Sequence, residues 1–124
     1  LLSRAKTVVG TPLFMPPEVL AGASYDTAAD IWSIGITAIE AADGYPPHHG
    51  ENIMRAIMLI GSNPPPTLKD PTRWSDNFNN FIQLCCQKEA VQRSSAEHLL
   101  NHPFIQAVAN APPSYKPLAH LIEE

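Results

Sequence analysis

Apolar residues recur at helical spacing in several windows along this chain of 124 residues. The first window, about residues 27–42, is apolar or small on nearly every side, and Asp26 precedes it as a candidate N-cap. A helix that is apolar all round is a buried helix, so this window is predicted to form the core. Its apolar and small residues include Ile31, Trp32, Ile34, Ile36, Ala38, Ile39 and Ala42.

A second helix is predicted over residues 51–60, where five large apolar side chains are spaced for one broad face. Two of them are methionines, Met54 and Met58, which lie one helical turn apart. Methionine adapts to irregular gaps, so we expect these two side chains to fill the core. The prolines that follow, at 64–66, end this helix.

Two more helices are predicted from their capping residues. Ser75 is a candidate cap for a helix that runs to about residue 86, with apolar residues at intervals of three and four. The capping-box sequence Ser94-Ser95-Ala96-Glu97 opens the next helix, which is expected to end before His102 and Pro103. No window alternates in β-branched residues, so strands are not expected and the predicted fold class is mainly α.

Proline and small polar residues divide the chain into a domain and a tail. The segment after residue 105 is rich in proline up to residue 117, which is typical of a linker, and residues 118–124 either begin another helix or fray. We therefore expect a domain over 1–105 and a linker and tail over 106–124. The chain opens at Leu1 without an initiator methionine, which suggests a fragment of a longer protein.

Charge and cysteine content narrow the possible partners. Eight basic residues are scattered among twelve acidic ones, giving a formal charge of −4, so nucleic acid is not an expected partner. The apolar runs are far shorter than the roughly 20 residues of a membrane span, so no membrane partner is expected.

The only cysteines are the neighbours Cys85 and Cys86, which favours a reducing compartment and a cytoplasmic location. No spacing of histidine and cysteine matches a metal-ligand pattern, so no metal site is predicted.

Five ordered motifs point to a known family: residues 7–12, 17–19, 30–40, 63–66, and 92–93 leading to 99–104. The chain resembles the eukaryotic protein kinases, from the end of the activation segment through the last helices of the large lobe. It is most similar to the sterile-twenty-like serine/threonine kinases of the Hippo type, and residues 30–40 and the triple proline favour that branch. Pro16 and Phe14 depart from the family pattern, which has Ala and Trp there.

The resemblance assigns structural roles to three charged residues. Glu18 corresponds to a carboxylate that pairs with a distant arginine, and Arg93 stands at the position of that arginine. The alternative is two ordinary surface charges. Asp30 corresponds to a carboxylate that braces the catalytic loop from the start of the central helix. Without that loop, Asp30 can still interact favourably with the positive end of the helix dipole.

Two threonines carry expected roles in substrate positioning and regulation. Thr11 stands where serine/threonine kinases place a hydroxyl that helps to position the acceptor; otherwise it is a turn residue before Pro12. Thr7 matches the activation-segment phosphorylation site of Hippo-type kinases, where phosphate would order the segment through arginine contacts. Outside that context Thr7 would be an ordinary solvated loop residue.

The groups that bind nucleotide in this family are not found in the 124 residues. The chain has no Gly-x-Gly-x-x-Gly, His-Arg-Asp or Asp-Phe-Gly sequence, so it is expected to bind neither ATP nor magnesium and to have no turnover alone. The complete kinase would use ATP and Mg²⁺, with protein substrates, the rest of its own domain and an activating kinase as partners. A noncatalytic kinase-like module that binds proteins around residues 51–60 is the alternative.

Overall fold

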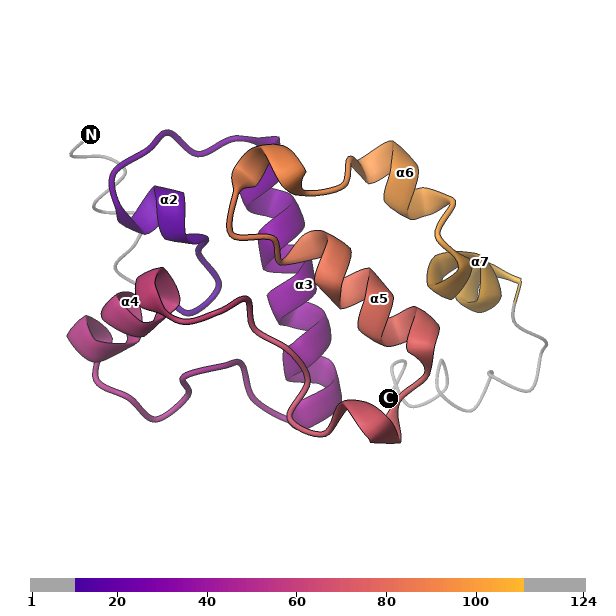
Figure 1. Ribbon diagram of the computed structural model, residues 1–124, viewed down its shortest axis with the longest axis horizontal. Coiled ribbons are helices and arrows are strands. Elements are labelled where there is room, and N and C mark those ends of the chain that lie inside the picture. Colours follow the sequence, from indigo (N-terminus) through magenta and orange to yellow (C-terminus); the bar gives the residue numbers. More distant parts are fainter. Residues whose placement is uncertain (1–10, 111–124) are drawn as a thin grey trace, which may run out of the picture.

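The computed structural model describes residues 11–110, and these are folded into helices joined by ordered loops (Figure 1). The helical segments are α2 (Pro17–Leu20), α3 (Thr27–Asp43), α4 (Ile53–Ser62), η1 (Pro71–Arg73), α5 (Asp76–Cys85), η2 (Ala90–Gln92), α6 (Ala96–Leu100) and α7 (Pro103–Ala109). Residues 11–110 contain no strand, which confirms the prediction of a mainly helical fold.

The long helix α3 is the centre of the structure. Asp26 caps its start by accepting a hydrogen bond from the Ala28 amide at 2.9 Å, as the sequence predicts. Its end is set by Gly44, whose left-handed conformation (φ 92°) lets its amide donate to the Glu40 carbonyl at 2.8 Å. Figure 1 shows α5 alongside α3, with α2 and α4 on one side of this pair and α6 and α7 on the other.

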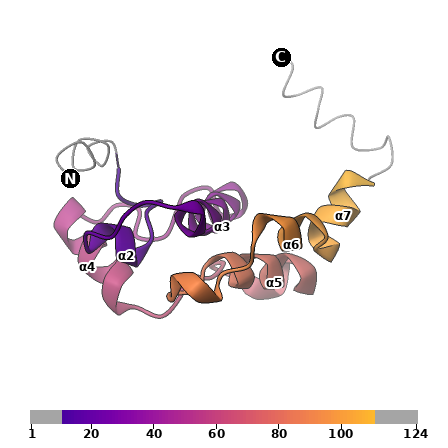
Figure 2. The same cartoon turned by 90° about the horizontal axis from the view of Figure 1, so that it is seen from above.

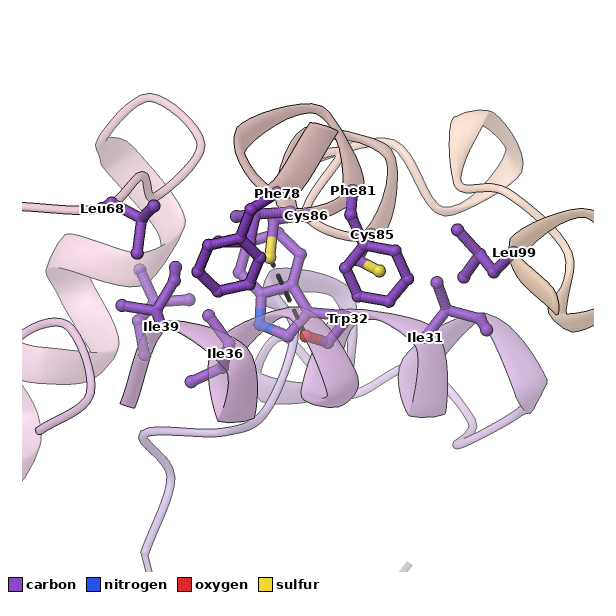
Figure 3. Close-up of a cluster of buried hydrophobic side chains, with 12 residues drawn as sticks. Ile31, Trp32, Ile36, Ile39, Leu68, Phe78, Phe81, Cys85, Cys86 and Leu99 are labelled. Atoms are coloured by element: carbon purple, nitrogen blue, oxygen red, sulfur yellow. Dashed lines mark hydrogen bonds between the residues drawn. The ribbon is translucent and has the colours of Figure 1, made fainter. Parts of the chain in front are cut away.

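The core lies between α3 and α5, which face each other in both views (Figure 2). Gly35 allows the close approach, because a Cβ atom at this position would lie 2.7 Å from Cys85 Cβ. The Cys86 Sγ lies 3.9 Å from the Trp32 carbonyl oxygen, also across this contact (Figure 3). The buried cluster contains Ile31, Trp32, Ile36, Ile39, Ile60, Leu68, Phe78, Phe81, Ile82, Cys85, Cys86 and Leu99.

The predicted burial of α3 and α4 is only partly correct. Ile34 on α3 is 46% exposed, although the helix is apolar on nearly every side. On α4, Ala56 and Ile60 are buried, whereas Met54 and Met58 are 75% and 56% exposed, so the prediction that both methionines fill the core was wrong. The reason is geometric: α4 packs against α2 and the core through one face, and no other part of residues 11–110 covers its opposite face.

The start of α6 lies one residue later than the capping-box sequence suggests. Ser95 is the N-cap, and its hydroxyl accepts a hydrogen bond from the His98 amide at 3.1 Å. The amide of Ser94 already donates to the Leu84 carbonyl at 3.2 Å, at the end of α5. A capping box on Ser94 would need that same amide for Glu97, so the tertiary contact moves the cap by one residue.

The segment expected to begin the linker is helical over its first four residues. His102 caps α7 through its Nδ1, which accepts from the Phe104 amide at 3.0 Å, and Pro103 occupies the first turn. The Phe104 ring stacks on Phe78 with centroids 4.8 Å apart. This contact attaches α7 to α5, and residues 106–109 continue the same helix. Most of the predicted tail lies outside the described residues.

Candidate functional site

A short segment, residues 11–18, ends at α2 and is attached to the helical core by one ion pair. Arg93 Nη1 lies 2.7 Å from Glu18 Oε2, and Nη2 lies 2.7 Å from Oε1. The two planar groups therefore meet through two parallel hydrogen bonds, although the residues are 75 positions apart in the sequence. We call Glu18 and Arg93 the ion-pair anchor.

The rest of the Arg93 side chain is held by backbone carbonyls and by an aromatic ring. Its Nη1 also donates to the Ala28 carbonyl at 3.0 Å, and its Nε donates to the Gln87 carbonyl at 2.7 Å. The guanidinium carbon lies 5.1 Å from the centre of the Trp32 ring, within the range of a cation–π contact. The Arg93 side chain is 0% exposed, so these partners replace the water that the charge has lost.

The ionisation of Glu18 reflects two opposing effects. Partial burial alone would raise its pKa, but the hydrogen bonds from Arg93, a backbone hydrogen bond and the charge of Arg93 together hold the pKa below its ordinary value of 4.5. The carboxylate is therefore charged at neutral pH. The anchor is an ion pair and not a neutral hydrogen bond.

A second contact, which the sequence analysis missed, holds the middle of the segment. The Ser33 hydroxyl on α3 donates a 2.6 Å hydrogen bond to the carbonyl of Phe14. The Phe14 side chain also packs against the core. The position of Ser33 within the motif at residues 30–40 is the only sequence signal for this contact, and nothing in helical periodicity indicates it.

Thr11 and Asp30 lie at exposed positions in residues 11–110. The Thr11 hydroxyl accepts a 3.2 Å hydrogen bond from the Leu13 amide, which is the local turn contact expected of a threonine before proline. Asp30 Oδ1 accepts a 2.7 Å hydrogen bond from the Tyr25 hydroxyl, and this bond raises the pKa of Tyr25. Neither residue takes part in the ion-pair anchor. Thr7 lies outside the described residues.

A comparison of the sequence with models of protein families gives a match that covers both residues of the ion-pair anchor. The model of the protein kinase domain matches residues 2–105. The chain belongs to the protein kinase domain family. The anchored segment, the central helix α3 and the helices that follow are thus part of a kinase domain, and the predicted partial kinase fold is confirmed.

The match places the ion-pair anchor within the kinase domain, since Glu18 and Arg93 both fall inside residues 2–105. It extends to Ile105, in the first half of α7. The helix continues to Ala109, so the end of the match does not coincide with the end of regular structure.

The acidic residues of this part of the kinase domain do not form a metal-binding group. Within residues 11–110, no three His, Cys, Asp or Glu side chains are gathered closely enough to hold an ion. The thiols of Cys85 and Cys86 are free and buried, and burial raises the pKa of Cys85 to about 12. A thiol with so high a pKa is neutral at pH 7 and is a poor metal ligand or nucleophile.

No helix within residues 11–110 combines the length and the apolar character that crossing a membrane requires.

Proposed function

We propose that this chain is the substrate-side, helical part of a serine/threonine protein kinase of the sterile-twenty-like, Hippo type. The complete enzyme transfers the γ-phosphate of ATP to serine or threonine in protein substrates. The 124 residues alone have no turnover, and the remainder of the kinase domain is their first partner.

The observation that carries the proposal is the ion-pair anchor. Segment 11–18 needs a fixed position if it is to orient an acceptor, because phosphoryl transfer depends chiefly on positioning and on stabilisation of charge. The anchor supplies that fixed position, together with the 2.6 Å hydrogen bond from Ser33 to the Phe14 carbonyl. Both contacts originate on the rigid helical core, so the segment is held at its middle and at its end.

The serine/threonine preference rests on Thr11 and on the family resemblance. Thr11 is exposed at the free end of the anchored segment, where its hydroxyl is available to an acceptor and to the catalytic loop of the complete domain. Residues 30–40 and the triple proline at 64–66 support the sterile-twenty-like branch. Asp30 is exposed at the start of α3, at a position suited to bracing that loop.

ATP and Mg²⁺ do not fit the residues of this chain. Residues 11–110 gather no group of three His, Cys, Asp or Glu side chains that could hold the ion, and the sequence contains no glycine loop for the phosphates. When bound in the complete kinase, Mg-ATP supplies the phosphoryl group. The chain itself contributes the fixed segment and the support for it.

The family resemblance also suggests how the kinase is regulated, through phosphorylation of Thr7. Thr7 is the proposed site of phosphorylation by the kinase itself or by an activating kinase. Its phosphate would order the activation segment by pairing with arginine. Mass spectrometry of the active gene product is expected to find phosphate on Thr7, and phosphate found only at other residues would refute the assignment. The two free, buried cysteines are consistent with a cytoplasmic enzyme.

A noncatalytic binding module is the second candidate, and one observation favours it. The α4 helix exposes three large apolar side chains, Ile53, Met54 and Met58, at 59%, 75% and 56%. Exposed apolar groups gathered on one element are typical of a protein contact.

The experiment that separates the two candidates is a phosphorylation assay on the full-length gene product. Peptides that differ only in having serine, threonine or tyrosine as acceptor are incubated with Mg-ATP, and the mass increase is followed. The proposal expects transfer to serine and threonine, and no transfer by the 124-residue chain assayed in parallel. Transfer only to tyrosine would refute the specificity. No transfer by a folded, Thr7-phosphorylated gene product would favour the binding module.

A further inference from the structure

The α4 helix ends where the following chain has no backbone donors to offer. Its C-cap, Asn63, is extended (φ −79°, ψ 160°) and donates its amide to the Leu59 carbonyl at 2.9 Å. The next three residues, 64–66, are prolines and have no N–H group. Many helices, roughly a third to a half, satisfy their last carbonyls by a left-handed turn of the following chain, and this arrangement excludes that solution.

Lys88 supplies the donors that the prolines lack. Its Nζ donates to the carbonyls of Ile60 at 3.1 Å, Gly61 at 2.9 Å and Asn63 at 2.6 Å. An ammonium group has three donors and no acceptor, so all of its hydrogen-bonding capacity is used at this helix end. A positive charge there also interacts favourably with the helix dipole.

The backbone of Lys88 is held by the ion-pair anchor. Arg93 donates from Nε to the Gln87 carbonyl at 2.7 Å and from Nη2 to the Lys88 carbonyl at 3.4 Å. The same guanidinium binds Glu18 at the start of α2, and α2 packs directly against α4. The contacts form a closed ring from α2 to Arg93, to Lys88, to α4 and back to α2. Figure 1 shows α2 and α4 as neighbours on the same side of α3.

We propose that Lys88 is a positioning residue, which fixes α4 against α2 and so completes the support of segment 11–18. Without the Lys88 ammonium, the ring is open: α4 keeps its contact with α2 but is no longer connected to Arg93. The end of the segment is then held by the ion-pair anchor and by the contact between α2 and α4, with no connection between the two. The consequence for catalysis rests on the proposed kinase function, whereas the consequence for α4 does not.

The structural part is tested by hydrogen exchange on the full-length gene product. Lys88→Met removes the three donors and keeps an unbranched side chain. Lys88→Arg keeps charge and donors, and Lys69→Met removes a lysine that contacts Tyr45 away from α4. Because hydrogen bonds from a charged group are lost, protection of the amides at 61–63 is expected to fall about tenfold in Lys88→Met. Lys88→Arg is expected to restore it and Lys69→Met to leave it unchanged. Unchanged protection in Lys88→Met would overturn the proposal.

The catalytic part is tested by steady-state kinetics on the same variants. A loosened segment binds the acceptor less well, so Lys88→Met is expected to raise the KM for a protein acceptor about three- to tenfold while the KM for ATP stays unchanged. A merely structural role would instead lower the amount of active enzyme without separating the two KM values. An unchanged acceptor KM in a variant with altered exchange would refute the positioning role.

Two further controls keep the result interpretable. If Lys88→Met does not fold, Lys88→Gln replaces it, since a neutral amide cannot supply three donors. If the wild-type gene product transfers no phosphate, the proposed kinase function fails, and the exchange experiment still decides whether Lys88 holds the end of α4.

Discussion

Replacing Glu18 by glutamine tests how much of the domain depends on the ion-pair anchor. Gln has nearly the same shape and can still accept one hydrogen bond, but it carries no charge. The Arg93 side chain is 0% exposed and that of Glu18 is 25% exposed, so the substitution leaves a buried guanidinium without its counter-ion. Breaking a buried pair in this way costs about 3 to 5 kcal/mol.

We expect a value near the lower end of that range, for two reasons. Arg93 keeps its hydrogen bonds to the carbonyls of Ala28 and Gln87, and Glu18 already has partial contact with solvent. The expected loss is therefore about 3 kcal/mol, a large part of the roughly 5 to 15 kcal/mol by which a domain is stable.

The measurement is chemical denaturation of the full-length gene product, with the large-lobe transition followed by circular dichroism. The matched control is Glu51→Gln. Glu51 also pairs with an arginine, Arg55, at 3.2 Å, but these side chains are 39% and 53% exposed and lie four positions apart on the surface. Such a pair contributes about 0.3 to 0.5 kcal/mol, so the control isolates the effect of burial.

Equal effects of the two substitutions would refute this reasoning. A loss below about 1 kcal/mol for Glu18→Gln would mean that the anchor behaves like an ordinary surface pair, with the guanidinium satisfied by carbonyls alone. Arg93→Lys supplies a further check, because an ammonium cannot make both parallel hydrogen bonds to Glu18 and is expected to destabilise the domain as well.

Three further outcomes are expected. The folded-state pKa of Glu18 lies below its ordinary value of 4.5. The stability that this carboxylate contributes is therefore complete above pH 4.5 and is lost as the pH falls through the lowered pKa. Glu18→Gln is expected to remove this contribution from the dependence of the unfolding free energy on pH. Gly35→Ala is expected to destabilise the domain by about 1 to 3 kcal/mol, because the new Cβ would overlap α5. A Cβ at Gly61 would meet no atom within 4 Å, so Gly61→Ala is expected to stabilise the domain by up to about 1 kcal/mol. The opposite order of melting temperatures would contradict the packing described. Ser33→Ala leaves the half-buried Phe14 carbonyl without its donor and is expected to cost about 1 to 3 kcal/mol and to raise exchange in segment 11–18, so unchanged exchange would argue against that contact.

Much of the helical framework could be predicted from local sequence. Asp26 and Ser75 cap α3 and α5 as predicted, because a cap is a contact between residues only two or three positions apart. The periodicity of apolar residues likewise identifies the helices, since it depends only on the geometry of a single turn. Cap assignment fails at Ser94, where a contact with Leu84 takes the amide that the local pattern requires.

Recognising the contact between Glu18 and Arg93 needed the family resemblance, because no local pattern relates residues 75 positions apart. The sequence shows that the two residues carry opposite charges, and only the structure shows that their side chains lie within hydrogen-bonding distance. Ser33 and Lys88 went unrecognised because each donates to a backbone carbonyl. A carbonyl is present at every residue and leaves no mark in the sequence.

By itself, then, the sequence determined the kinase family, the mainly helical fold and the approximate position of the principal helices. The tertiary structure alone decided which faces of those helices are covered. Met54 and Met58 match a core pattern, yet they are exposed, because burial depends on whether another element reaches that face. In the same way, the donors for the last carbonyls of α4 come from Lys88, 27 positions beyond Gly61. Helix formation is governed by neighbours within one turn, whereas burial and anchoring are governed by chain segments that only folding brings together.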